Sequence, residues 1–352
     1  MVLGHIPVRA EVLQRAWPVT HPLPQPDGLR PCCAFGYDLH AEVMKVPVPF
    51  YQFSNVVTAW DMGEHHYNDS LLLGLANLVG IGSERNGILY TSRGGFIDTA
   101  HIRDTADMTL YIFSQLLPQL GQPFTLSLDD ELTQRRLVFR AFTPPTTEGE
   151  RYLLAVWIAA HLAFQLAAWH EIAQWYGFES VPGFPEEVSA FSPEDLYSNL
   201  LGANIAVSLI RRGQAITLGV YDAAMDDALR KALITLDVQP AAMTRFHFDM
   251  LDGRWWNSRR RVPEKYLVLR RNYDISDDRI PTPVPGERAT PLRLHLPHCW
   301  HGFSLDMLAQ LELWPGRSMA RLPMPELCCY TAVDFARLAA AAFASDRAAE
   351  ER

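Results

Sequence analysis

The chain has 352 residues, of which 48% are hydrophobic and 20% charged, as in an ordinary globular protein with either one large core or two packed lobes. Its net charge of -9 argues against a surface built for nucleic acid, because phosphate binding depends on Lys and Arg. We therefore expect a small-molecule or peptide substrate and no nucleic acid.

Residues 1–50 are rich in proline, whose fixed φ and missing N–H oppose regular structure, and they predict an N-terminal arm over the core. The first 20 residues lack the features of a secretory signal, which favours a cytoplasmic location. Five cysteines without a CxxC spacing indicate neither a disulfide framework nor a zinc ribbon. We interpret them as small buried apolar side chains, with a redox or metal role for Cys32 and Cys33 as the alternative.

The next segments alternate between short strands and helices. A strand is expected at 87–91, followed by a tight turn at Gly94 and Gly95 and by a helix that starts near Ile97 or Asp98. Alternating residues then predict a hairpin with strands at 124–128 and 136–142.

A long helix is predicted from 151 to 176, with Gly177 suited to its C-terminal cap. Its stretch from Tyr152 to Trp169 carries no charge and is about long enough to span a bilayer. Because the stretch contains His161 and Gln165 and many alanines, we interpret it as a core helix and expect no transmembrane span.

Residues 191–195 read FSPED, which predicts a helix start with Ser192 as N-cap, Pro193 in the first helical position and Asp195 completing a capping box. Replacing Ser192 by alanine would then cost about 1 kcal/mol. Later segments predict helices at 221–236, 240–251, 304–313 and 331–346, and strand-like runs at 266–269 and 292–296.

These elements predict a mainly α protein with short β elements (α+β), in which central apolar helices carry a small hairpin and a Pro-rich arm. We divide it into the arm at 1–50, a helical core at 51–252 that carries the candidate site, and a mixed C-terminal region at 253–352 packed on the core.

Four strings resemble a family of uncharacterised bacterial proteins: RGGFID at 93–98, HIRD at 101–104, WHEI with WYG at 169–177, and FSPEDLYSNLLG at 191–202. The resemblance extends from PCCAFG at 31–36 to the tryptophans at 255–256, and it implies no particular activity. Many members of that family carry a lipoprotein-type signal, so the resemblance points to the cell envelope whereas the N-terminus points to the cytoplasm.

Asp98 and His101 form the first candidate pair for chemistry, since three residues apart on a helix they share one side, where the carboxylate can orient the imidazole. The pair can act as a general base or bind a metal. In the structural alternative, Asp98 caps the helix and His101 is a buried hydrogen-bonded residue.

His170 and Glu171 form the second candidate pair, in a sequence that resembles half of a zinc-protease HExxH helix. Gln174 stands where the second histidine would be, so an ordinary zincin is excluded. We expect His101 to lie close to His170 or Glu171 and to share a metal, a water or a substrate group with them. The alternative is a polar patch at the end of the helix.

Other polar clusters receive structural interpretations. Glu194 and Asp195 could add carboxylates to the candidate site, but the order Ser-Pro-Glu-Asp explains them better as cap and first-turn acids of the next helix. The pair His65 and His66 is interpreted as surface residues of a loop, with capture of a metal as the alternative. The histidines at 295, 298 and 301 also have ligand-like spacing, but they rank lowest among the candidate metal ligands because no helix aligns them.

Two functions follow from the residues. The first is a metal-dependent hydrolase in which His101 and Glu171 perform acid/base work, around zinc, iron or manganese held by Asp98, His101, His170 and Glu171. In it, Arg93 and Arg103 bind a substrate carboxylate or phosphate. The second is a non-catalytic binding or structural protein with a buried polar network and a pocket lined by aromatic residues, namely Trp169, Trp175, Tyr176, Trp255 and Trp256.

Overall fold

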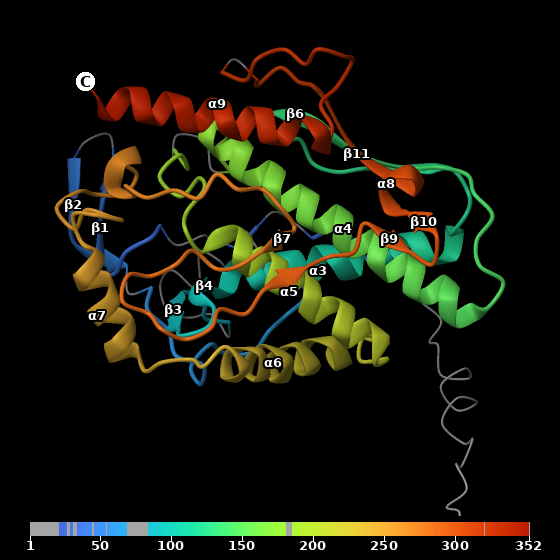
Figure 1. Ribbon diagram of the computed structural model, residues 1–352, viewed down its shortest axis with the longest axis horizontal. Coiled ribbons are helices and arrows are strands. Elements are labelled where there is room, and N and C mark those ends of the chain that lie inside the picture. The colour runs from blue at the N-terminus through green and yellow to red at the C-terminus, as the bar shows by residue number, and fades with distance from the viewer. Residues whose placement is uncertain are drawn as a thin grey trace, which may run out of the picture.

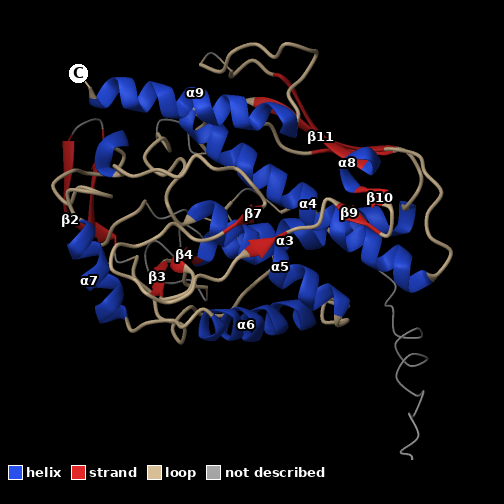
Figure 2. Ribbon diagram, in the orientation of Figure 1, coloured by secondary structure: helices blue, strands red, loops and turns tan. Residues whose placement is uncertain are grey.

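The computed structural model describes residues 21–26, 29–30, 34–43, 46–53, 55–68, 84–180, 185–319 and 321–351. Within these ranges the chain is mainly helical with short strands, so the predicted α+β class is confirmed (Figures 1 and 2). Cys32 and Cys33 lie outside the described residues. Cys299, Cys328 and Cys329 are free thiols, and only Cys329 is buried as expected.

Three helices form the centre of the molecule: α3 (Thr99–Leu116), α4 (Glu148–Trp175) and α5 (Asp195–Arg211), each packed against the other two. In the part of the chain that is described, α4 is long and apolar enough to cross a membrane by length and composition, yet 83% of its most apolar window is buried inside the protein. The helix is buried because other elements pack around it, and its small alanine side chains permit close packing. The predicted core helix is thus confirmed. Gly177 follows α4 with φ +95°, the conformation predicted for its cap.

Two further helices cover this centre from opposite sides (Figure 1). Helix α6 (Leu218–Thr235) packs on α5 through a stripe of buried residues at helical spacing, and α9 (Ala332–Glu350) packs on α4 in the same manner. Both were predicted, and their ends differ from the predicted ends by a few residues.

An antiparallel sheet packs beside α4 and has the strand order β11-β6-β5. The predicted hairpin is present as β5 (Phe124–Ser127) and β6 (Thr133–Phe139). The helix predicted at 304–313 is wrong, because only α8 (Leu305–Leu308) is helical and β11 (Ala309–Pro315) pairs with the whole of β6. Its alternating buried residues have the period of a strand.

A second apolar core gathers aromatic side chains around α7 (Ala241–Leu251), including Phe35, Phe248, Trp255 and Trp256. Trp169, Trp175 and Tyr176 instead belong to the main core. The five aromatic residues expected around one pocket are therefore divided between two cores. Residue 50, the predicted boundary between the arm and the helical core, lies inside β2 (Val46–Phe53), which pairs with β1 (Leu39–Val43). The division into three regions stays a prediction.

The segment between α7 and α8 consists of extended chain with very short elements. These are the 3-10 turn η2 (Lys265–Leu267), where a strand was expected, and the strand pairs of β7 (Asp278–Arg279) with β8 (Leu294–His295) and of β9 (Cys299–Trp300) with β10 (Phe303–Ser304). The segment crosses in front of α5 and α4 (Figure 1).

Candidate metal centre

Asp98 stands where a short hairpin becomes a helix. Strands β3 (Ile88–Thr91) and β4 (Gly95–Asp98) pair through the turn at Gly94 and Gly95, and α3 begins at the next residue. The Oδ1 atom of Asp98 accepts a hydrogen bond from the backbone N–H of Ala100 at 2.7 Å, which confirms the predicted N-cap. The cap holds the carboxylate at the start of α3, on the side that carries His101.

The start of α5 is held closely against the start of α3. A Cβ atom at Gly202 would lie 2.1 Å from the carbonyl oxygen of Ile102, so only glycine permits this approach. Asn199 donates to the hydroxyl of Thr105 at 2.9 Å, and the backbone N–H of Asp98 donates to Ser198 Oγ at 3.0 Å. These contacts fix the first turn of α5 beside Asp98 and His101.

Asp195 completes a group of three. Its Oδ1 atom lies 3.3 Å from Nε2 of His101, and ligand atoms of Asp98, His101 and Asp195 all lie within 4.8 Å of one another. All three residues are buried. Neither carboxylate oxygen of Asp195 has a hydrogen-bond partner among the described residues.

The interpretation of Asp195 as part of a capping box is wrong. Helix α5 begins at Asp195 without a side-chain cap, and the buried hydroxyl of Ser192 has no hydrogen-bond partner in the described ranges. Successive turns lead into the helix, and the N–H of Asp195 bonds to the Ser192 carbonyl instead. Asp195 was therefore missed as a site residue because a local pattern already explained its charge.

Two more buried carboxyl groups lie beside this group. Glu171, from α4, accepts a hydrogen bond from the backbone N–H of Phe191 at 2.6 Å, and its other oxygen has no hydrogen-bond partner in the part of the chain that is described. Phe191 has φ +57°, an uncommon conformation that aims its N–H at this carboxylate. Glu194 is equally buried, and neither of its carboxylate oxygens has a hydrogen-bond partner within the same ranges.

The electrostatics of these groups follow from burial and from mutual repulsion. Burial, together with the charge of Asp195, raises the pKa of Glu171 to about 8. Burial and the neighbouring carboxylates, among them that of Asp98, also raise the pKa of Glu194 and of Asp195 well above the usual range. The charge of His101 acts on Glu171, so the two residues lie in one electrostatic group. A ligand shared between them stays a prediction.

His170 points toward a different partner. Its Nδ1 atom lies 2.5 Å from Oε1 of Glu131, a buried residue of the β5–β6 loop that also pairs with Arg135. Burial acts to lower the pKa of His170, but the charge of Glu131 outweighs it and raises the pKa to about 9. His170 is thus buried in an ion pair rather than in a patch at the end of the helix, and its predicted role as a metal ligand stays a prediction.

Positive charge reaches the carboxylates from the C-terminal segment. Arg271 and Arg279 are almost fully buried and interact electrostatically with Glu171 and Asp195. Arg271 is bound to backbone carbonyls, among them that of Lys265 at 2.8 Å, whereas Nε and Nη1 of Arg279 have no hydrogen-bond partner among the residues described. Neither arginine was predicted to lie beside these carboxylates, because separation along the chain gives no sign of this proximity.

Arg93 and Arg103, the predicted substrate-binding residues, donate to groups elsewhere. Arg93 donates to the backbone carbonyl of Thr235 at 3.1 Å. Arg103 is fully buried and donates to the Met62 carbonyl at 3.1 Å and to Asn86 at 2.7 Å. Substrate binding by these residues stays a prediction that their contacts do not favour.

Arg103 borders another buried cluster, which we call the paired cluster and which consists of Arg30, His65, Glu84, Arg103 and Asp107. The guanidinium of Arg30 lies 2.6 Å from Glu84 and 3.0 Å from Asp107. The imidazole of His65 lies between the same two carboxylates, 3.1 Å from Glu84 and 3.0 Å from Asp107. The expectation that His65 is a surface residue is therefore wrong, because its loop folds over the side of α3.

The group of Asp98, His101 and Asp195, with Glu171 and Glu194 beside it, is called the acidic cluster below. Carboxylate oxygens and an imidazole nitrogen that converge from separate helices form the kind of set that binds a divalent metal in helical proteins. Without a cation, protons can neutralise the same carboxyl groups.

Comparisons with known proteins give a family but no activity. No curated protein and no solved structure matches the chain. One family model matches residues 20–285, a range that contains the acidic cluster and the paired cluster, and the resemblance stated from the four sequence strings agrees with it. Because this match covers more than half of the chain, the protein belongs to the family described as protein of unknown function (DUF4056).

Proposed function

We propose that the acidic cluster binds a divalent metal ion through Asp98, His101 and Asp195 and uses it for hydrolysis of a small-molecule or peptide substrate. The observation that carries the proposal is the convergence of three ligand atoms, all within 4.8 Å of one another, on buried residues at the starts of two helices. Placing carboxylates in a protein interior costs several kcal/mol per ion unless an opposite charge compensates. A bound cation supplies that charge.

The donor set favours manganese. Two carboxylates and one imidazole offer mainly oxygen ligands, which suit manganese and magnesium, while the imidazole extends the choice to iron and zinc. Glu171 is available as a further oxygen donor or as a base beside the metal.

Hydrolysis is the reaction class that this set supports best. A metal ion held by these residues would lower the pKa of a bound water and so supply a nucleophile. Glu171 is held by the Phe191 N–H through one oxygen, and its other oxygen would serve as the acid or base beside the metal. Arg279 adds a buried guanidinium close to the acidic cluster, which favours a substrate with an anionic group.

One observation favours the alternative of a non-catalytic protein. The side chain of His101 is only 8% exposed, and Asp98, Glu171 and Asp195 are fully buried. Such burial is typical of a structural metal site or of a network of protonated carboxyl groups. Turnover of a substrate by the metal-loaded protein distinguishes the two functions.

The first test is elemental analysis of the purified protein beside Asp195→Asn and Glu194→Gln variants. We expect Asp195→Asn to hold about one equivalent less of manganese, iron or zinc than the wild type, and Glu194→Gln to hold as much as the wild type. Glu194 is the matched control because it is adjacent and equally buried but lies outside the group of three. Equal metal content in folded wild type and Asp195→Asn contradicts the proposal.

The second test is activity. The metal-loaded protein is assayed on chromogenic esters, phosphoesters and peptides, and Glu171→Gln is expected to keep the metal while losing about 100-fold or more in kcat. Full metal occupancy without turnover of any of these classes supports the structural alternative instead.

A further inference from the structure

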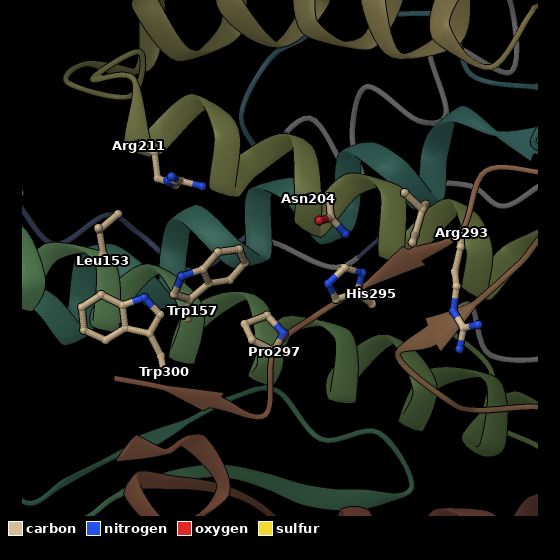
Figure 3. Close-up of a pocket in the computed structure, with 9 residues that line it drawn as sticks. Leu153, Trp157, Asn204, Arg211, Arg293, His295, Pro297 and Trp300 are labelled. Atoms are coloured by element: carbon tan, nitrogen blue, oxygen red, sulfur yellow. The ribbon is translucent and has the colours of Figure 1, made fainter. Parts of the chain in front are cut away.

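A groove of about 450 Å³ lies between the central helices and the C-terminal segment, away from the acidic cluster. Helices α4 and α5 supply Trp157, Asn204 and Arg211 to its wall, and the segment from 293 to 300 supplies the other side, including Pro297 and Trp300 (Figure 3). Its two indole rings lie close to each other at one end (Figure 3).

Two histidines adjoin this groove along the chain. His161 lies one turn after Trp157 on α4, and His298 directly follows Pro297. Asp277 lies between them, with one oxygen 3.4 Å from Nδ1 of His161 and the other 3.0 Å from Nε2 of His298. Ligand atoms of the three residues all lie within 4.8 Å of one another.

The orientation of His161 is that of a metal ligand. Its Nε2 atom lies 2.8 Å from a carboxylate oxygen of Asp306 and 2.9 Å from the amide of Gln165. The residue is only 4% exposed, and its Nδ1 atom faces Asp277 at 3.4 Å without good hydrogen-bond geometry. Histidines that bind metals use one ring nitrogen as ligand and donate the other N–H to a carboxylate, which is the role that Asp306 fits.

A protonated His161 between two aspartates is the competing explanation. Burial acts to lower its pKa, but the carboxylates of Asp277 and Asp306 outweigh that effect and raise the pKa to about 9. An ion pair accounts for His161 and the aspartates. It gives no reason for the second imidazole, because the side chain of His298 is 60% exposed and still lies against Asp277.

We propose that His161, Asp277 and His298 form a second metal site, specific for zinc, at the edge of the groove. Two imidazoles and one carboxylate are the donors that zinc takes in sites with an open fourth position. That position is left for water or for a donor atom of a molecule in the groove. The acidic cluster contains more carboxylates and takes the harder ion, so the two sites differ in metal preference.

The test uses the full chain with the acidic cluster silenced by Asp195→Asn, so its outcome does not depend on the proposed hydrolase centre. After chelation and dialysis, zinc is titrated against a chromophoric chelator, and cobalt is added in parallel to observe its visible bands. We expect one zinc equivalent and a cobalt spectrum of low coordination number.

Replacing the exposed histidine separates ligand binding from folding. His298→Ala is expected to weaken zinc at least about 100-fold and to abolish the cobalt bands with an unchanged melting temperature. His295→Ala is the matched control, since His295 is exposed in the same segment and lines the groove without belonging to the group of three. Equal zinc affinity in the two variants, or no zinc binding at all, overturns the proposal.

Discussion

The paired cluster and the acidic cluster both include residues of α3, and both are buried, yet they differ in how their charge is balanced. Around Arg30, each carboxylate lies within 3.0 Å of a guanidinium or imidazole nitrogen. Around Asp195, carboxyl groups are more numerous than imidazoles, and several oxygens have no hydrogen-bond partner in the described ranges. Burial alone therefore does not distinguish the two clusters, whereas the direct pairing of their carboxylates does.

The largest effect is expected from Arg30→Met in the paired cluster. Loss of the guanidinium leaves Glu84, Asp104 and Asp107 without the group that pairs with all three, and the free energy of unfolding should fall by about 3–5 kcal/mol. Urea denaturation of wild type and variant measures this loss of unfolding free energy. The matched control is Arg85→Met, which breaks an exposed pair with Asp61 and should cost less than about 1 kcal/mol. Similar costs for both variants would mean that the paired cluster does not stabilise the fold.

A smaller effect of opposite sign is expected from Asp195→Asn in the acidic cluster when metal is removed. This variant takes one repelling carboxyl group out of the interior, so the chelated protein should gain about 1 kcal/mol of stability. With saturating manganese the order should reverse, because only the wild type gains stability from binding. Thermal melts of wild type and variant, recorded once with chelator and once with manganese, measure these two stability differences. A loss of stability in chelator would show that Asp195 belongs to a balanced network.

The smallest effect concerns pH and the paired cluster. Burial acts to lower the pKa of His65, but Asp107 and Glu84 outweigh it and hold the pKa above its usual 6.5. His65 therefore contributes stability that is fully present below pH 6.5 and is lost as the pH rises through its folded pKa. The stability difference between wild type and His65→Gln should be largest in acid and shrink with rising pH. A difference that is constant across this range would exclude titration of His65 as its source.

Much of the architecture was predictable from local pattern. The apolar stretch of α4, the cap at Asp98, the end at Gly177 and the β5–β6 hairpin were all expected and are present. The expected helix at 304–313 failed because the pairing of β11 with β6 outweighs local helix propensity. The expected cap at Ser192 failed because turns continue into α5 without using its hydroxyl.

The candidate site was predictable only in part. Asp98 and His101 could be paired because three residues on a helix bring side chains to one face. Asp195, Arg271 and Arg279 could not be added, since they come from distant segments that meet only when α5 packs on α3 and the C-terminal chain crosses over. His161 and His298 show the same limit, since their residue numbers differ by 137 and one aspartate joins them in space.

The amino-acid sequence by itself determined where the long helices lie, which of them is buried on nearly every face, and that a carboxylate begins α3, because these properties depend on neighbours within one or two turns. Only the tertiary structure decided which buried charges are compensated. Compensation depends on the distance between groups far apart in the chain, and the close approach at Gly202, where a single Cβ would meet the Ile102 carbonyl, sets that distance for Asp98, His101 and Asp195.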